Sequence, residues 1–186
     1  MDQPHRMNQG YPLQLLYSPE RIQTEIARLA KEINASYDGR ELLVIVVLKG
    51  ALFFAADLLR LLTVPVRMDL VKLSSYAGTE SCGTVRLTKD LEFEVAGKDV
   101  LVVEDIVDTG LTLVYLLDLL KQRGAGSLRV CTLIDKMERR QAEVTADFVG
   151  FHCQGGFLVG YGLDLDERMR ELPAIYQMIQ DDDGEI

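Results

Sequence analysis

Continuous apolar runs separated by segments of helical periodicity set the organisation of this chain. Residues 42–48, 99–103 and 128–134 are rich in β-branched side chains and show little polar alternation. Strands with this pattern are buried on both faces, as in parallel sheets that helices cover on each side. The pattern therefore predicts an α/β fold with a central, mostly parallel sheet.

Three segments have the periodicity of helices that would cover such a sheet. Ser18 followed by Pro19 predicts a helix start, because the hydroxyl caps free N–H groups and proline suits the first turn. The helix predicted over residues 51–62 is apolar on nearly every side, so we expect it to be buried, in part at an oligomer interface. A third helix is predicted over residues 111–123. The apolar stripe of the first helix consists of Ile22, Ile26, Leu29, Ala30 and Ile33.

The patterns are weaker in the other parts of the chain. Residues 64–73 are strand-like, residues 74–84 form a small polar loop that we expect to act as a lid, and residues 85–88 and 92–95 predict a short hairpin. Both chain ends lack periodicity, and we expect them to fray. The ends expected to fray are residues 1–17 and 181–186. The remaining predictions are short strands at 147–151, 157–159 and 173–179 and an exposed helical turn at 165–172.

Composition narrows the class of protein. The 186 residues are 48% hydrophobic and contain no linker or repeat, which predicts one domain. A net charge of -9 argues against a general nucleic-acid binder, whose phosphate contacts require a basic face. The three cysteines are odd in number and lack CxxC spacing, which favours a reducing compartment. Without an apolar run of ~20 residues or a signal-peptide core, we expect a cytoplasmic protein with no membrane partner.

Charged residues follow each buried strand. Lys49 comes after the first strand, Glu104 and Asp105 after the second, and Lys136 after the third. The carboxyl ends of such strands meet at one edge of the sheet, where open α/β sheets bind ligands. The predicted helix start after Gly110 suits a phosphate, which the two carboxylates would repel. The two acids therefore predict that the ligand also offers sugar hydroxyls or a divalent cation. For Lys49 and Lys136, position alone leaves two interpretations open, a ligand contact or a solvated side chain.

The run Glu104-Asp105-Ile106-Val107-Asp108-Thr109-Gly110-Leu111-Thr112 closely resembles the phosphoribosyl-diphosphate signature of the type I phosphoribosyltransferases. Further matches occur in order at Leu48-Lys49-Gly50, Ser75-Tyr76, Lys136 and residues 157–164, and they resemble the hypoxanthine-guanine members of that family. The resemblance covers residues 42–172. It implies a Rossmann-like parallel sheet flanked by helices, with a core at about 18–150 and 173–180 and a small hood formed mainly from 151–172 with N-terminal residues.

The resemblance also implies an activity in purine salvage. Hypoxanthine or guanine would displace pyrophosphate from 5-phosphoribosyl 1-diphosphate, with Mg²⁺ as cofactor and these small molecules as partners. Glu104 and Asp105 would hold the ribose hydroxyls directly or through Mg²⁺, and Asp108 would act as the catalytic base near nitrogen 7 of the purine. Thr109, Gly110, Leu111 and Thr112 would bind the 5-phosphate together with Asp108.

The same resemblance assigns the remaining substrate contacts. Lys49 and Arg170 would bind pyrophosphate, and the peptide between Leu48 and Lys49 is expected to be able to adopt the cis form. Lys136 would donate to oxygen 6 of the purine. The other implied contacts are Gly50 beside the pyrophosphate, Ser75 and Tyr76 closing over the site, Phe157 stacking on the base, Leu158 reading the base edge through its backbone, and Asp164 binding Mg²⁺.

Two alternatives are open at this stage. One is a regulator that binds nucleic acid and uses the same fold as a phosphoribosyl-diphosphate sensor, although the net charge disfavours it. The other is an enzyme of the same class for another base: xanthine, uracil or adenine. A donor at Lys136 disfavours adenine, whose 6-amino group is itself a donor, while xanthine stays open. Leu165 and Met169 stand where relatives often carry aromatics, which leaves base preference open. We expect a homodimer or homotetramer.

Overall fold

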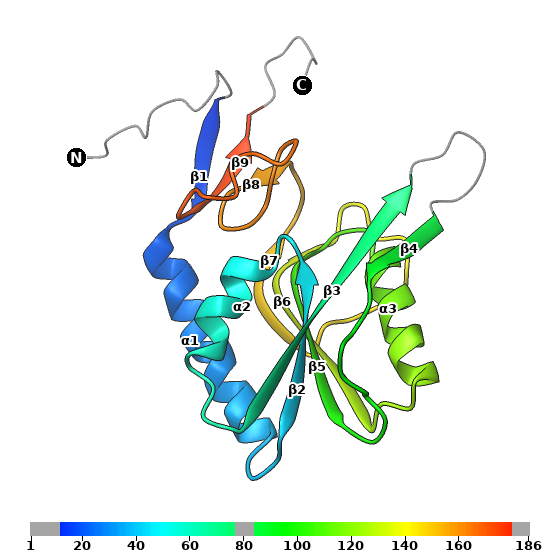
Figure 1. The fold of residues 1–186 in the computed structure, drawn as a ribbon. Helices are drawn as coiled ribbons and strands as arrows, with labels where there is room; N and C mark the ends of the chain where they lie inside the picture. The colour runs from blue at the N-terminus through cyan, green and yellow to red at the C-terminus, as the bar shows by residue number, and fades with distance from the viewer. Residues whose placement is uncertain (1–11, 77–83, 180–186) are drawn as a thin grey trace.

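The computed structural model describes residues 12–76 and 84–179, and it has a six-stranded sheet with a smaller three-stranded sheet beyond one end (Figure 1). The order in the large sheet is β4-β3-β2-β5-β6-β7. All neighbours are parallel except β3 and β4, which confirms the predicted α/β class. The bounds are β2 (Leu42–Leu48), β3 (Val66–Tyr76), β4 (Thr84–Lys89), β5 (Asp99–Val107), β6 (Ser127–Lys136) and β7 (Phe148–Cys153).

Helices cover both faces of this sheet. α1 (Pro19–Ser36) and α2 (Leu52–Leu59) pack on one face and α3 (Leu111–Gln122) on the other (Figure 1). Side chains in β2 alternate between the two apolar cores: Val44 and Val46 join the cluster under α1 and α2, whereas Ile45 and Val47 join the cluster under α3. Because β2 is buried on both sides, its sequence has no polar alternation.

The first helix begins as predicted. Ser18 is the N-cap, its hydroxyl accepts a hydrogen bond from the N–H of Arg21 at 3.4 Å, and Pro19 occupies the first turn. The predicted apolar stripe is buried. In contrast, α2 is shorter than the predicted 51–62, and Leu52 and Phe53 remain 48% and 42% exposed. The prediction that this helix is buried is therefore wrong for these two side chains in the single chain.

The small sheet, which we call the hood from here on, corrects two expectations. It consists of β1 (Leu13–Tyr17), β9 (Ile175–Met178) and β8 (Leu158–Val159), in the order β1-β9-β8. Residues 13–17 thus form a strand where a frayed end was expected, because β9 supplies an antiparallel partner from the other end of the chain. The strand expected within 173–179 exists, but it pairs in the hood and not with the core sheet.

Two further local predictions are wrong. The expected hairpin between 85–88 and 92–95 does not form, since β4 pairs antiparallel with β3. The carboxylate of Asp69, only 5% exposed, instead accepts hydrogen bonds from the N–H groups of Glu92 and Phe93 at 2.7 and 2.9 Å. These two bonds satisfy backbone N–H groups that the hydrogen bonds of a β-hairpin would otherwise satisfy.

Segments 74–84 and 165–172 also differ from expectation. β3 extends through Tyr76 and β4 begins at Thr84, so only residues 77–83 of the expected lid lie between strands, and these lie outside the described residues. Residues 165–172 are not helical, because Asp166, Glu167 and Met169 have positive φ angles that a right-handed helix cannot contain.

Candidate functional site

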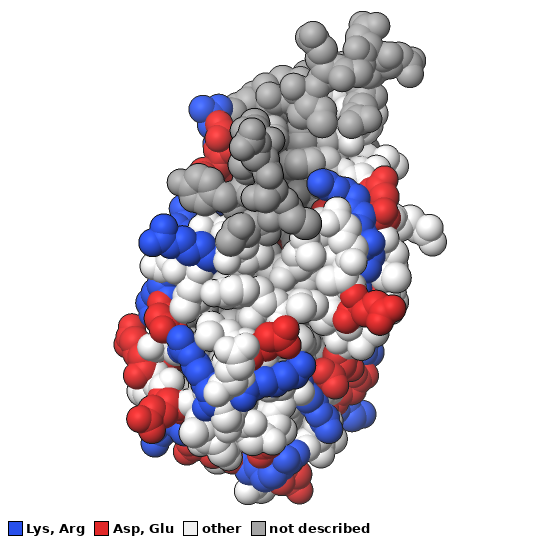
Figure 2. All heavy atoms as spheres, turned by 90° about the vertical axis from the view of Figure 1, so that its right-hand side faces the viewer, with Lys and Arg blue, Asp and Glu red and all other residues white. Residues whose placement is uncertain are grey.

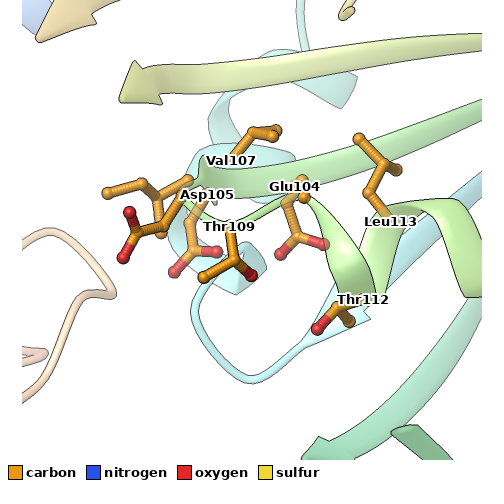
Figure 3. A pocket seen from close by; sticks show the side chains of 9 residues that line it. Glu104, Asp105, Val107, Thr109, Thr112 and Leu113 are labelled. Carbon is orange, nitrogen blue, oxygen red and sulfur yellow. The ribbon is translucent and has the colours of Figure 1, made fainter. Parts of the chain in front are cut away.

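A hollow of about 210 Å³ lies at the carboxyl end of β5 (Figure 3). β5 carries Glu104 and Asp105 to its end, and Thr112 comes from the first turn of α3, as Figure 3 shows. Gly110 is the α3 N-cap with φ +82°, a conformation that suits glycine. The complete lining is Glu104, Asp105, Ile106, Val107, Asp108, Thr109, Gly110, Thr112 and Leu113. The acidic end of the strand and the helix N-terminus therefore share one cavity.

Glu104 and Asp105 are both unfavourable as free anions here. Burial raises the pKa of Glu104 well above its ordinary value, and the neighbouring Asp105 charge raises it further. Burial likewise raises the pKa of Asp105. Two adjoining carboxylates that resist ionisation suit a partner that brings positive charge or donates hydrogen bonds. This is the chemistry of a hydrated Mg²⁺ or of ribose hydroxyls.

The three predicted metal residues do not form a single cluster. In residues 12–76 and 84–179, no group of three or more His, Cys, Asp and Glu side chains could hold a metal ion. Asp164 is engaged elsewhere, with Oδ1 2.8 Å from Nη2 of Arg170. Mg²⁺ usually takes one or two carboxylates together with waters and substrate phosphates, and Glu104 with Asp105 fits that arrangement.

The loop after β2 closes against Asp105. The peptide between Leu48 and Lys49 is cis, a form that the resemblance implied it can adopt. A Cβ atom at Gly50 would lie 1.7 Å from Oδ2 of Asp105, so only glycine allows this approach. A Cβ atom at Gly162 would in turn lie 2.0 Å from the carbonyl oxygen of Gly50. The β2 loop, the β5 end and the hood therefore meet through two glycines.

Lys136 lies beside Asp108, one of the residues that line the cavity. Nζ of Lys136 lies 3.8 Å from Oδ2 of Asp108, and Lys136 is 6% exposed. The other carboxylate oxygen of Asp108, Oδ1, is buried and has no hydrogen-bond partner among the described residues. A buried unpaired oxygen is costly unless a ligand satisfies it. This oxygen is consequently available to accept a proton or hydrogen bond from a bound molecule.

A second group of charges lies between the β2 loop and the hood. Nζ of Lys49 is 3.0 Å from Oε2 of Glu167, which is also 3.1 Å from Nη2 of Arg170. These contacts lower the pKa of Glu167, with the Lys49 hydrogen bond as the main cause. Nε of Arg170 is buried and has no hydrogen-bond partner in the described part of the chain. Two cations therefore converge on one carboxylate, an arrangement that suits an anionic ligand group.

The other predicted contacts occupy varied places. Phe157 is exposed beside buried Leu158 at the start of β8. Leu111 begins α3 and donates its N–H to the Thr109 hydroxyl at 3.5 Å. Ser75 and Tyr76 end β3, and their side chains lie outside the described part of the structure.

Sequence reasoning missed three cavity residues and two arginines. Ile106, Val107 and Leu113 line the hollow although their side chains offer no polar chemistry. Arg139 lies 3.8 Å from Asp108, and Arg140 binds the cavity wall through carbonyl oxygens. The only sequence signal for the arginines was their proximity to Lys136.

The chain matches the phosphoribosyl transferase domain over residues 15–166. It belongs to the phosphoribosyltransferase family. This phosphoribosyltransferase is 44% identical over 189 residues to the hypoxanthine-guanine phosphoribosyltransferase of Mycobacterium avium, covering 94% of this chain and 93% of that protein. It is 46% identical over 162 residues to that of Bacillus subtilis, covering 87% and 90% of the two chains.

A solved structure supports the same assignment. The phosphoribosyltransferase fold described above matches a hypoxanthine phosphoribosyltransferase from Staphylococcus aureus with a TM-score of 0.88 at 37% identity, over 96% of this chain and 97% of that chain. The protein is accordingly an enzyme of the glycosyltransferase class that transfers a phosphoribosyl group. Among the described residues, no helix is long and apolar enough to cross a membrane.

Proposed function

We propose that this phosphoribosyltransferase serves purine salvage by transferring the 5-phosphoribosyl group from 5-phosphoribosyl 1-diphosphate to hypoxanthine and guanine. The supporting observation is the unpaired buried Oδ1 of Asp108, next to Lys136 and on the wall of a cavity suited to phosphate. Relatives named for hypoxanthine and guanine support the choice of base.

The reaction can be written with the residues of this site. Nitrogen 9 of the purine forms a bond to carbon 1 of the ribose as the bond from carbon 1 to the pyrophosphate oxygen breaks, and pyrophosphate leaves with the electron pair. Asp108 accepts the proton that the purine loses at nitrogen 7, a contribution of about 10²–10⁴-fold in rate. Lys136 donates to oxygen 6 and stabilises the charge that develops on the base.

We assign the remaining roles by chemistry. Lys49 and Arg170 bind the leaving pyrophosphate, and Phe157 stacks on the base while the backbone of Leu158 reads its edge. Glu104 and Asp105 hold the ribose and Mg²⁺; the metal, when bound, neutralises charge on the leaving group. Asp164 holds Arg170 in this structure, so its direct contact to metal requires that this ion pair rearrange.

Activity measurements test this function directly. The protein is mixed with phosphoribosyl diphosphate, Mg²⁺ and, separately, hypoxanthine, guanine, xanthine, adenine and uracil, and nucleotide formation is followed. Conversion of neither hypoxanthine nor guanine would refute the proposal. Asp108→Asn is expected to lower kcat about 10²–10⁴-fold with little change in affinity for phosphoribosyl diphosphate. An equal loss in both quantities would make Asp108 a binding residue.

The charge distribution on one face of the molecule disfavours the alternative function of nucleic-acid binding. Figure 2 shows acidic and basic side chains interspersed over the described part of the face that it displays. A phosphate backbone requires a basic stripe or patch. Electrophoretic mobility shift with RNA and DNA, run beside the activity assay, separates the two functions.

We also propose a cytoplasmic homodimer or homotetramer. Exposed Leu52 and Phe53 on α2 support self-association, since contiguous apolar side chains are favoured at subunit interfaces. The free thiols Cys131 and Cys153 suit a reducing compartment. Light scattering coupled to size exclusion tests the assembly: Phe53→Glu should shift it towards monomer, and an unchanged mass would exclude this face.

A further inference from the structure

Arg140 is bound to the main chain of the cavity wall. Its side chain is only 14% exposed and forms an ion pair with Asp135. The guanidinium donates to main-chain carbonyl oxygens from three stretches of chain. These bonds are Nε to Asp108 O at 2.9 Å, Nη2 to Val107 O at 3.0 Å and to Lys136 O at 3.3 Å, and Nη1 to Val144 O at 2.8 Å.

The residues after Arg140 continue this contact. The N–H groups of Gln141 and Ala142 donate to the carbonyl oxygen of Thr109 at 2.9 and 3.1 Å. Three consecutive carbonyls, those of Val107, Asp108 and Thr109, are therefore held by segment 140–142. The turn between β5 and α3 is fixed by bonds to its backbone and not only by its own sequence.

Holding these carbonyls also orients the N–H groups that follow them. In a trans peptide, the C=O of one residue and the N–H of the next point in opposite directions. The N–H groups of Asp108, Thr109 and Gly110 must then point away from segment 140–142. Asp108, Thr109 and Gly110 line the hollow, whereas none of residues 140–142 is among the described residues that line it. Successive N–H groups of this kind form an anion-binding concavity.

We propose that Arg140 is a positioning residue for the 5-phosphate of the substrate and product. By holding the Val107 and Asp108 carbonyls outward, it aims the next two N–H groups at the phosphate, while Gln141 and Ala142 do the same for Gly110. This inference rests on the proposed function, because it takes a ribose 5-phosphate as the ligand of the cavity.

The guanidinium is specifically suited to this task. Its planar fork presents five donors in fixed directions, so it can reach the separate carbonyls of Val107, Asp108 and Val144 at once. The ammonium of lysine is a point donor and cannot bridge them in the same geometry. Arg140→Lys therefore keeps the charge and removes the orientation of the peptide groups.

The position of Lys136 adds a consequence for base binding. Its carbonyl accepts from Arg140 at 3.3 Å, and its own Nζ lies 3.8 Å from Asp108. The end of β6, which carries the lysine proposed to bind oxygen 6 of the purine, is thus attached through Arg140 to the turn proposed to bind the phosphate. Loss of Arg140 is still expected to affect the phosphate most, because the Val107 and Asp108 carbonyls that it holds directly precede the N–H groups proposed to bind the phosphate.

Paired ligands isolate the phosphate contribution. Binding of IMP and of inosine, which lacks the phosphate, is measured by calorimetry for the wild type, Arg140→Lys and Arg140→Gln. Arg28→Lys is the matched control, since Arg28 also donates to a backbone carbonyl, Val149 O at 2.6 Å, but lies far from the cavity on α1. Thermal unfolding of each variant shows whether it is folded.

Arg140→Lys should weaken IMP binding about tenfold or more, equivalent to about 1.4 kcal/mol, and leave inosine binding within about twofold. The KM for phosphoribosyl diphosphate should rise by a similar factor and the KM for hypoxanthine much less. Arg28→Lys should leave the ratio of the two affinities unchanged. If folded Arg140→Lys or Arg140→Gln keeps the wild-type ratio, the inference is overturned. A wild type that converts no purine base would refute the proposed function separately.

Discussion

Nζ of Lys49 lies 3.0 Å from Oε2 of Glu167, which joins the loop after β2 to the hood across the place where we propose that pyrophosphate binds. Arg170 contacts the same carboxylate at 3.1 Å. The Glu167 carboxylate therefore neutralises the two cations that we propose for binding the leaving pyrophosphate. To bind Lys49 and Arg170, pyrophosphate must displace the Glu167 carboxylate, and the free-energy cost of this displacement can be measured.

Glu167→Gln should lower the KM for phosphoribosyl diphosphate. An exposed ion pair contributes about 0.2–1 kcal/mol, so the expected decrease is at most about fivefold. Steady-state kinetics check it, with Glu171→Gln as an exposed control in the same segment. A higher KM in Glu167→Gln would mean that this carboxylate assists binding.

The effect of Glu167 should not depend on pH near neutrality. The Lys49 and Arg170 contacts lower the pKa of Glu167 below its ordinary value, so the group stays ionised above about pH 4.5. Any stability that it contributes is present above the unfolded pKa and is lost as the pH falls through the folded pKa. The ratio of KM values for wild type and Glu167→Gln should be constant from about pH 6 to 9. A ratio that changes across this range would point to a different titrating group.

Glu104→Gln should stabilise the metal-free protein at alkaline pH while impairing catalysis. The folded pKa of Glu104 is raised, so its protonated form favours folding below the unfolded pKa, and that advantage is lost as the pH rises through the folded value. The neutral amide avoids this loss. We expect an increase in Tm of about 2–4 °C for each 1 kcal/mol gained, measured in EDTA.

Two comparisons sharpen the Glu104 experiment. The Tm difference from wild type should shrink as the pH is lowered, because wild-type Glu104 then becomes neutral too. Exposed Glu94→Gln serves as the control and should show no such trend. Mg²⁺ with phosphoribosyl diphosphate should raise the Tm of wild type more than that of Glu104→Gln; equal increases would remove Glu104 from the ligand site.

Gly50→Ala should reduce kcat/KM about 10²-fold. The added Cβ would lie 1.7 Å from Oδ2 of Asp105, so the loop or the carboxylate must move by an amount that costs orders of magnitude in rate. Steady-state kinetics check this value. Gly39→Ala is the matched control: Gly39 has φ +71° and no atom within 4 Å of an added Cβ, so it should lower stability and keep activity. Normal kinetics in Gly50→Ala would show that Asp105 can relocate freely.

Tyr161→Phe should destabilise the attachment of the hood. The Tyr161 hydroxyl donates to Asp57 in α2 at 2.6 Å, and a hydrogen bond to a charged group contributes about 1.5–3 kcal/mol. Burial, together with the Asp57 charge, raises the pKa of Tyr161, so the bond persists through alkaline conditions. Thermal unfolding at pH 7 and 9 should show the same decrease in Tm. No decrease at either pH would mean that water replaces the hydroxyl without loss.

The sequence was most informative where local pattern and tertiary environment agree. The strand over residues 42–48 was predicted with its observed bounds, because an uninterrupted apolar run is unambiguous when both faces are covered. Ser18 and Pro19 placed the start of α1 for a similar reason, since capping is a local interaction.

Long-range bonds explain what the sequence did not predict. Residues 13–17 form a strand because β9 lies beside them. In the segment 92–95, where a strand was predicted, the N–H groups of Glu92 and Phe93 instead donate to the carboxylate of Asp69. The motif supplied the acidic cavity, but not Arg140, whose contacts are to carbonyl oxygens that every residue possesses. A side chain that acts through another segment's backbone leaves no recognisable spacing.

The pairing of β1 with β9 also has a consequence for biosynthesis. These strands come from opposite ends of the described chain, and β8 joins their sheet only through β9. Contacts of such large sequence separation form late, because the intervening chain must first be ordered. During translation, the core sheet and its acidic cavity can assemble before the hood exists. The enzyme would thus acquire its proposed phosphate-binding turn early and complete its proposed base-binding side only after β9 leaves the ribosome.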